Sequence, residues 1–176
     1  MQLLETNRLI LSEMTLADAP FILALLNDPA WIKNIGDRGV RTIPDAENYL
    51  RDVYMPLYAR LGFGLWLVRR KTDHTTMGMC GLMKRDSLPH ADIGFAFLPE
   101  FYGKGYAYEA ASACVNYARQ TLHLPRLLAI TLPENERSIT LLQKLGFRFE
   151  QTTKMSDDAD ELNVYKLELS GSPETA

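Results

Sequence analysis

The chain has 176 residues, of which 47% are hydrophobic and 23% are charged, and its formal net charge is −3. This length and apolar content suit one folded domain with a sizeable core, and they argue against a disordered chain. Basic and acidic residues are interspersed without a basic stripe, so we expect no direct nucleic-acid partner. No apolar run approaches the roughly 18 residues that a membrane span needs. The first residues also lack the basic start and apolar core of a signal peptide, so we expect a cytoplasmic protein with no membrane contact.

The first half of the chain predicts one strand and two helices. Residues 8–12 read as a strand, and Asp18 is expected to cap the helix that follows. Residues 29–41 show little periodicity and predict a loop. Asp45 is expected to open a second helix, which Pro56 should end or kink.

The second half predicts strands in two groups with helices between them. Three short apolar runs separated by turn-like breaks indicate an antiparallel meander. Small apolar residues at helical spacing then predict a helix that lies close to a sheet. A further strand, a helix from Asn135 that Gly146 caps, and two final strands complete the pattern. In chain order these segments are 63–68, 77–83, 92–98, 107–118, 127–132, 135–146, 147–152 and 164–169.

The predicted fold class is α+β, with a mixed, mostly antiparallel sheet and helices on both of its faces. The strand–helix–strand unit at 92–132 is the expected parallel exception, because a helical crossover joins parallel strands. We expect one domain over residues 1–170 and a frayed polar tail at 171–176.

The spacing of the cysteines and the sequence context of the histidines do not predict a metal site. Cys80 and Cys114 have no metal-ligand spacing, and we expect buried free thiols in a reducing compartment. The three histidines lie in polar or turn-like contexts, and no His/Asp/Glu cluster accompanies them.

The most informative segment is 102–107, Tyr-Gly-Lys-Gly-Tyr-Ala, between the predicted strand at 92–98 and the helix that follows it. Two glycines permit positive φ, so that backbone amides can turn toward one point. The start of the helix adds unpaired N–H groups and the positive end of its dipole. Such a loop suits a phosphate or pyrophosphate, although a Gly-x-Gly on its own can equally be a tight turn.

The order of three motifs resembles the GNAT superfamily of acetyl-CoA-dependent N-acetyltransferases. They are the strand at 92–98, the glycine loop at 102–107, and Asn135-Glu136-Arg137-Ser138 followed by 141–147. The segment 5–11, Glu-Thr-Asn-Arg-Leu-Ile-Leu, is similar to the start of the RimJ/RimL-type branch, the ribosomal-protein N-terminal acetyltransferases and their relatives. The resemblance runs from about Leu4 to Leu169.

The resemblance implies acetyl-CoA as the co-substrate, no metal, and a splayed parallel strand pair that holds the cofactor. Backbone groups of Phe97 and Leu98 would pair with the pantetheine amides, and Asn135 would contact the pantetheine arm. Backbone amides of the loop would bind the pyrophosphate, namely those of Gly103, Lys104, Gly105, Tyr106 and Ala107.

The implied reaction is direct attack of a primary amine on the thioester. The amine would come from a protein N-terminus or a small molecule, and the protein would act as a monomer or homodimer. Many family members carry a Tyr where this chain has Leu142, so Ser138 is the expected proton donor to the leaving thiolate, as in RimL-like relatives. Asp92, at the start of the strand beside the cleft, is the candidate base, with Glu13 or a water chain as alternatives. Trp31 is the candidate substrate contact.

Each assignment has a simpler structural alternative. Asn135 is also a good helix cap, and Ser138 can be an ordinary helix residue. The remaining candidates also have simpler explanations: Asp92 can be a solvated carboxylate, Lys104 a solvated loop lysine, and Trp31 a packing residue. At the level of function, the alternatives are a CoA-binding sensor or scaffold without turnover and a nucleotide-phosphate binder. Against a nucleotide-phosphate binder, the loop at 102–107 lacks both the Gly-Lys-Ser/Thr ending of a P-loop and the third glycine of a dinucleotide site.

Overall fold

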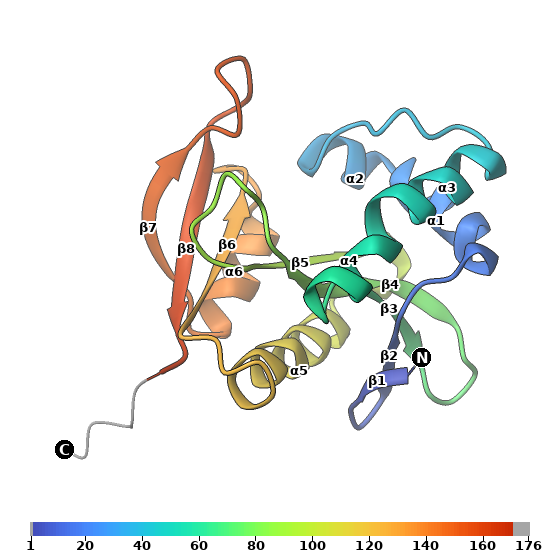
Figure 1. The fold of residues 1–176 in the computed structure, drawn as a ribbon, viewed down its shortest axis with the longest axis horizontal. Coiled ribbons are helices and arrows are strands. Elements are labelled where there is room, and N and C mark those ends of the chain that lie inside the picture. Colours follow the sequence, from blue (N-terminus) through green and yellow to red (C-terminus); the bar gives the residue numbers. More distant parts are fainter. Residues whose placement is uncertain (1, 171–176) are drawn as a thin grey trace.

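The fold is built on one mixed sheet, seen in a computed structural model that describes residues 2–170 (Figure 1). The predicted tail at 171–176 lies outside the described residues. The sheet has eight strands in the order β1-β2-β3-β4-β5-β6-β8-β7. Their bounds are β1 Gln2–Glu5, β2 Leu9–Ser12, β3 Leu65–Arg70, β4 Thr76–Met83, β5 Asp92–Phe97, β6 Arg126–Thr131, β7 Arg148–Thr153 and β8 Leu162–Glu168.

The sheet divides in the middle, between β5 and β6. All other neighbours are antiparallel, and this pair is the parallel exception that the sequence predicted. Within residues 2–170 the two strands pair only at Asp92 and Leu128, where the Leu128 N–H donates to Ala91 O over 2.9 Å. Beyond that point they diverge, and the β6–β8–β7 half turns away from the β1–β5 half (Figure 1). The predicted splayed pair is therefore confirmed.

Helices cover both faces because the strands alternate their apolar side chains between two cores. Leu65, Leu67 and Met79 pack with α1 and α3 on one face. Trp66 and Cys80 pack with α5 on the other. The helices are α1 Ala19–Leu26, α2 Pro29–Asn34, α3 Ile43–Tyr49, α4 Met55–Leu61, α5 Tyr106–Gln120 and α6 Glu136–Lys144. Helix α6 packs on the α5 face through Leu142, against the C-terminal strands.

Two predictions about the first half were wrong in detail. The segment 29–41 is not wholly a loop, because it begins with α2. Asp28 starts this helix by accepting a hydrogen bond from the Ala30 N–H over 2.9 Å, with Pro29 in the first turn. The second helix has Thr42 rather than Asp45 as its N-cap, and it ends at Tyr49, before Pro56 is reached. A π-helical turn at Leu50–Tyr54 follows α3, and Pro56 then lies in the first turn of α4, where its missing N–H costs little.

Candidate active site

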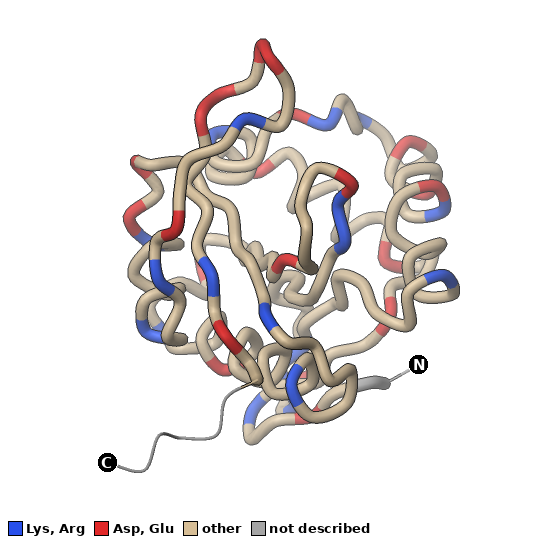
Figure 2. The backbone as a smooth tube through the Cα atoms, turned by 60° about the vertical axis from the view of Figure 1, so that its left-hand side comes forward, with Lys and Arg blue, Asp and Glu red and all other residues tan. Residues whose placement is uncertain are grey.

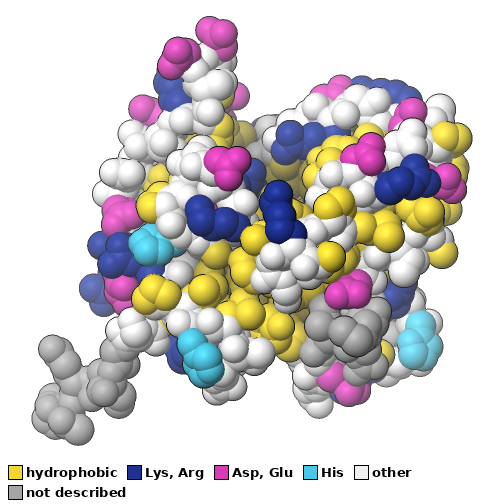
Figure 3. All heavy atoms as spheres, viewed as in Figure 1, with side chains coloured by type: hydrophobic (Ala, Val, Ile, Leu, Met, Phe, Trp, Pro, Cys, Tyr) yellow, Lys and Arg dark blue, Asp and Glu magenta, His cyan; other side chains and the backbone are white. Residues whose placement is uncertain are grey.

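A cleft of about 1680 Å³ opens where β5 and β6 diverge. Its walls come from β5, the glycine loop, the first turn of α6, and α2. In the space-filling view, apolar side chains gather over the middle of the molecule, with Lys and Arg side chains beside them (Figure 3). The cleft thus combines an apolar floor with an edge of unpaired strand.

The open edge of β5 presents backbone groups to the cleft. Leu98 N–H donates to Met77 O over 3.0 Å, so it faces β4, whereas Ala91 O faces β6. Because successive residues of a strand face opposite edges, Phe95 and Phe97 turn their N–H and C=O groups toward the gap. The Leu98 carbonyl accepts from the Phe101 N–H over 3.0 Å, so both backbone groups of Leu98 already have partners. Of the predicted pair, Phe97 faces the cleft with its backbone, and Phe95 joins it.

The glycine loop leads directly into α5. Gly103 and Gly105 have φ values of 71° and 79°, and Gly105 is the N-cap of the helix. As glycine has no side chain to cap the first turn, the amides at the start of α5 are left to face the cleft. A Cβ built on Gly103 would meet nothing within 4 Å, so open space adjoins the loop backbone. The Lys104 ammonium instead turns back to Glu100 O, at 2.9 Å.

The segment before β2 holds this loop in place from outside the cleft. Arg8 donates through Nη1 to Lys104 O at 3.0 Å and through Nε to Glu109 Oε2 at 2.6 Å. Its guanidinium also lies over the Tyr106 ring, 4.5 Å from the centroid. Burial acts to raise the pKa of Glu109, but hydrogen bonds from Thr6 and Arg8 together lower it. Glu109 therefore stays ionised and keeps Arg8 against the loop.

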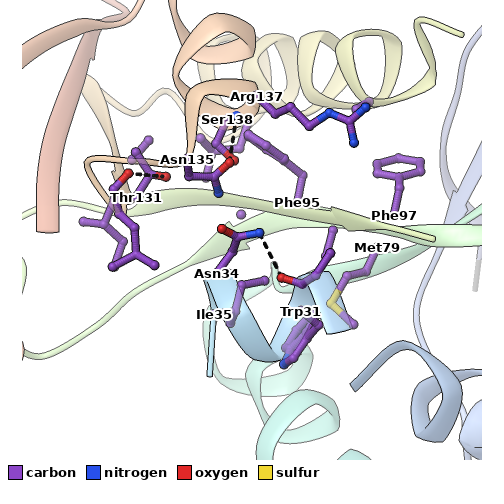
Figure 4. A pocket seen from close by; sticks show the side chains of 18 of the residues that line it. Trp31, Asn34, Ile35, Met79, Phe95, Phe97, Thr131, Asn135, Arg137 and Ser138 are labelled. Atoms are coloured by element: carbon purple, nitrogen blue, oxygen red, sulfur yellow. Dashed lines mark hydrogen bonds between the residues drawn. The ribbon is translucent and has the colours of Figure 1, made fainter. Parts of the chain in front are cut away.

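The first turn of α6 forms the opposite wall of the cleft. Asn135 caps the helix, because its Oδ1 accepts from the Ser138 N–H over 3.3 Å. In the described residues the Ser138 hydroxyl makes no hydrogen bond, and Asn135 and Ser138 both lie above Phe95 (Figure 4). The Arg137 guanidinium lies 3.9 Å from the centroid of the Tyr102 ring and so connects α6 to the glycine loop. Leu142, where many family members carry a Tyr, is buried.

Helix α2 closes the cleft from the other face of the sheet. Trp31 is only 6% exposed and packs in the second core, and its Nε1 donates to Gly36 O over 3.1 Å. Asn34 extends from α2 toward Asn135, and its Nδ2 donates to Ala30 O over 2.9 Å (Figure 4). Asn34 was missed because α2 was not predicted, although Asp-Pro at 28–29 is a helix-start signal.

Asp92 lies at the closed end of the gap and is tied to an arginine. The carboxylate is 1% exposed, and Arg85 Nε lies 3.2 and 3.1 Å from its two oxygens. Burial raises the pKa of Asp92, and the charge and hydrogen bond of Arg85 oppose that rise. Asp92 is thus not the solvated carboxylate of the simpler alternative. It belongs to a buried ion pair, and both members of the pair line the cleft.

Outside the cleft, the described residues include two cysteines. Cys80 and Cys114 are buried free thiols, as predicted, with their sulfurs 3.6 Å apart between β4 and α5. Among the described residues, no group of three His, Cys, Asp or Glu side chains could hold a metal ion. None of the helices within residues 2–170 has the length and apolar character that crossing a membrane requires. Basic and acidic residues are interspersed along the chain, and acidic ones gather at the tip of the β7–β8 turn, part of which lines the cleft (Figure 2).

Comparison with known proteins gives a consistent result. Residues 8–148 match the model of the acetyltransferase (GNAT) domain family. The chain is 31% identical over 171 residues to the uncharacterized N-acetyltransferase YoaA of Bacillus subtilis (strain 168), covering 94% of this chain and 96% of the relative. It is 36% identical over 70 residues to the ribosomal protein uS5-alanine N-acetyltransferase of Escherichia coli (strain K12), covering 40% of this chain and 36% of that one. The solved structure of RimL, the ribosomal L7/L12 alpha-N-protein acetyltransferase, in complex with coenzyme A superimposes with a TM-score of 0.80 at 17% identity, covering 96% and 98% of the two chains.

Proposed function

Because the chain belongs to the GNAT acetyltransferase family, we propose that its cleft holds acetyl-CoA along the open edge of β5 and admits a primary amine from the α2 side. The protein is an N-acetyltransferase, which transfers an acetyl group from acetyl-CoA to an amine. The observation that carries the proposed site is the divergence of β5 and β6 directly beside the glycine loop.

The residues of the cleft fit the parts of acetyl-CoA. Phe95 and Phe97 would hydrogen-bond the pantetheine amides with the backbone groups that face the gap, and Leu98 would add apolar surface. Asn135, whose Oδ1 is occupied by the helix cap, would offer its Nδ2 to the same arm. The pyrophosphate would lie against the open space beside the loop, on the backbone amides of Gly103, Lys104, Gly105, Tyr106 and Ala107. Bound there, acetyl-CoA supplies the reactive acetyl thioester.

We expect the acceptor to be an amine that is partly neutral near pH 7, because only a neutral amine can attack the thioester. An α-amine, with a pKa of about 8, has a useful neutral fraction, whereas a lysine amine near 10.4 has almost none. We propose that Asp92 accepts the amine proton through an intervening water, because its carboxylate is too buried for direct contact. A backbone N–H of Phe95 or Phe97 would stabilise the developing oxyanion. Trp31 would shape the acceptor pocket through its exposed edge.

For the acceptor, we propose a RimJ/RimL-like activity on a protein N-terminus. Its support is the identity with the uS5-alanine enzyme and the segment 5–11, whose Thr6 and Arg8 hold the loop and α5 in place. A small-molecule amine is the other acceptor that the cleft would admit.

The cofactor site can be tested by calorimetry in the presence of a chelator. We expect acetyl-CoA to bind in the micromolar range without a metal, because the loop amides and strand edge supply the contacts. An absence of binding, or binding only after metal addition, would contradict the site.

Replacing Ser138 with Ala is expected to lower kcat by up to about 100-fold with little change in acetyl-CoA affinity. The Ser138 hydroxyl has no other hydrogen bond in the described residues, lines the cleft and is the candidate donor to the leaving thiolate, and general acid assistance is worth about 10²–10⁴-fold. Steady-state kinetics and calorimetry on the same preparation separate the two effects. Ser112→Ala, in the middle of α5 and outside the cleft, serves as the control. An unchanged kcat would mean that solvent protonates the thiolate.

A further inference from the structure

We propose that Arg85, held in place by Asp92, binds an anionic group of the acceptor, so that the protein prefers amines carrying a carboxylate or phosphate close to the amine. This inference rests on the proposed function and narrows its acceptor. At a protein N-terminus the anionic group would be an acidic or phosphorylated side chain near the α-amine, and in a small molecule it would be the carboxylate or phosphate of the amine itself.

The first observation is the face of the sheet on which the pair lies. Along β5, Ile93 and Phe97 pack into the α5 core, whereas Ala96 packs against the α1–α3 core. By the same alternation Asp92 points to the α1–α3 face, the face from which α2 closes the cleft. Its cross-strand neighbour, Met83, lines the cleft beside Arg85. The ion pair therefore belongs to the acceptor side of the cleft, away from the glycine loop.

The second observation is the number of donors that Arg85 leaves over. A guanidinium has five N–H donors in a planar fork. Nε is used on Asp92, and Nη2 contacts Met83 Sδ at 3.5 Å. No other contact of the described residues occupies the Nη groups, and the Arg85 side chain is 32% exposed at the cleft. The outer N–H groups can thus pair with a carboxylate or phosphate in the bidentate manner that arginine favours.

The third observation is that Asp92, which holds Arg85 in place, is buried, whereas the Arg85 side chain is partly exposed. Asp92 is 1% exposed, and a buried ion pair is often no more stabilising than apolar residues of the same volume. Its evident structural effect is to fix the direction of the Arg85 side chain, whose planar fork needs a fixed orientation to recognise an oxyanion.

The distances along β5 agree with an acceptor that carries both groups. Phe95, whose backbone faces the proposed thioester, is three residues from Asp92, about 10 Å at 3.3 Å per residue. The bonds between the amine and the anion of the acceptor, together with the reach of the Arg85 guanidinium from its contact with Asp92, would have to cover this length.

The other charged side chains around the cleft have both signs. A measured preference for anionic over cationic acceptors therefore distinguishes the effect of Arg85 from that of the acidic side chains. Lys33 and Arg38 line the α2 side and have the same sign as Arg85. Asp28 caps α2 with its carboxylate. Asp158 and Asp160, on the acidic β7–β8 turn, also line the cleft and would favour a cationic acceptor instead.

The test compares matched amines by CoA release with the purified full chain. One pair is the peptide amides Ala-phosphoserine and Ala-Ser, and the other is the peptide amides Ala-Glu and Ala-Gln, which all present an α-amine, with spermidine as a cationic amine. We expect wild type to have a higher kcat/KM for the anionic member of at least one pair, and the pair that shows it identifies phosphate or carboxylate as the group bound. Arg85→Gln should lower the anionic-to-neutral ratio by about 10- to 100-fold, the value of one or two charge-assisted hydrogen bonds. Arg85→Lys should retain part of the preference.

The ratio separates recognition from a structural role, because a change in folding or in Asp92 would lower both acceptors of a pair alike. Arg119→Gln, an exposed charge change on α5 outside the cleft, should leave the ratio unchanged. Where Arg85→Gln destabilises the protein by leaving Asp92 unpaired, Arg85→Gln with Asp92→Asn removes the orphaned charge and the ratio is measured there. Equal acetylation of both members of each pair, or a preference for spermidine, would overturn the inference while leaving the acetyltransferase assignment intact. CoA release that depends on none of the amines would instead contradict the proposed function.

Discussion

Replacing Gly105 with Val is expected to weaken acetyl-CoA binding by about 100-fold or more while the protein stays folded. Gly105 has a φ of 79°, which a β-branched residue resists, and its Cβ would lie 3.3 Å from Arg8 Nη2. The loop would have to shift, and its amides would no longer converge on one point. Two lost charge-assisted hydrogen bonds at about 1.5 kcal/mol each amount to roughly 3 kcal/mol.

Calorimetry measures this affinity, and thermal unfolding shows whether the fold is kept. Gly62→Val is the matched control, because Gly62 ends α4 with a φ of 71°, has nothing within 4 Å of a built Cβ and lies outside the cleft. Both variants carry the backbone strain, but only Gly105→Val should lose the ligand. A folded Gly105→Val protein with wild-type affinity would refute the phosphate role of the loop.

Replacing Asp92 with Asn is expected to lower kcat/KM by about 100-fold and to remove the acidic limb of its pH profile. Burial raises the pKa of Asp92 above its usual value, so the carboxylate becomes protonated, and is lost as a base, as the pH falls through that raised pKa. Asn cannot take up the proton at any pH, so its profile should lack this limb.

The pH dependence of stability gives an independent check on the same group. A carboxyl whose folded pKa is raised favours folding when it is protonated, and this contribution is lost as the pH rises from the unfolded toward the folded pKa. Asp92→Asn should therefore flatten that part of the stability curve. Asp86→Asn, an exposed change next to Arg85, is the control. A wild-type pH–rate profile in Asp92→Asn would move the base to Glu13 or to a water relay.

The sequence predicted those parts of the fold that local patterns decide. Apolar alternation and helical spacing gave the meander, α5 and the strands that follow, and the crossover rule gave the parallel pair β5–β6. The short helix α2 was missed because six residues carry little periodicity, and with it Asn34 was missed as a cleft residue.

The site depended more strongly on contacts between distant segments. The register of β5 with β4 decides which backbone amides of β5 face the gap. Position in the motif alone therefore did not show that Phe95, rather than Leu98, faces the cleft. The contacts of Arg8 with Lys104 and Glu109 span about a hundred residues of sequence, and the Arg85–Asp92 pair needs the turn before β5 to fold back. Charge–charge partners of this kind leave no periodic signal in one sequence.

Amine-dependent release of CoA is the activity that distinguishes an N-acetyltransferase from a protein that only binds CoA. The purified protein is mixed with acetyl-CoA and with peptides beginning with Ala or Ser, or with a small amine, while free thiol and the mass of the acceptor are followed. We expect thiol release that requires an amine, equals the amount of N-acetylated product, and is lost in Gly105→Val. Tight binding of acetyl-CoA with thiol release that no amine accelerates would contradict this expectation and would indicate a CoA-binding protein without turnover.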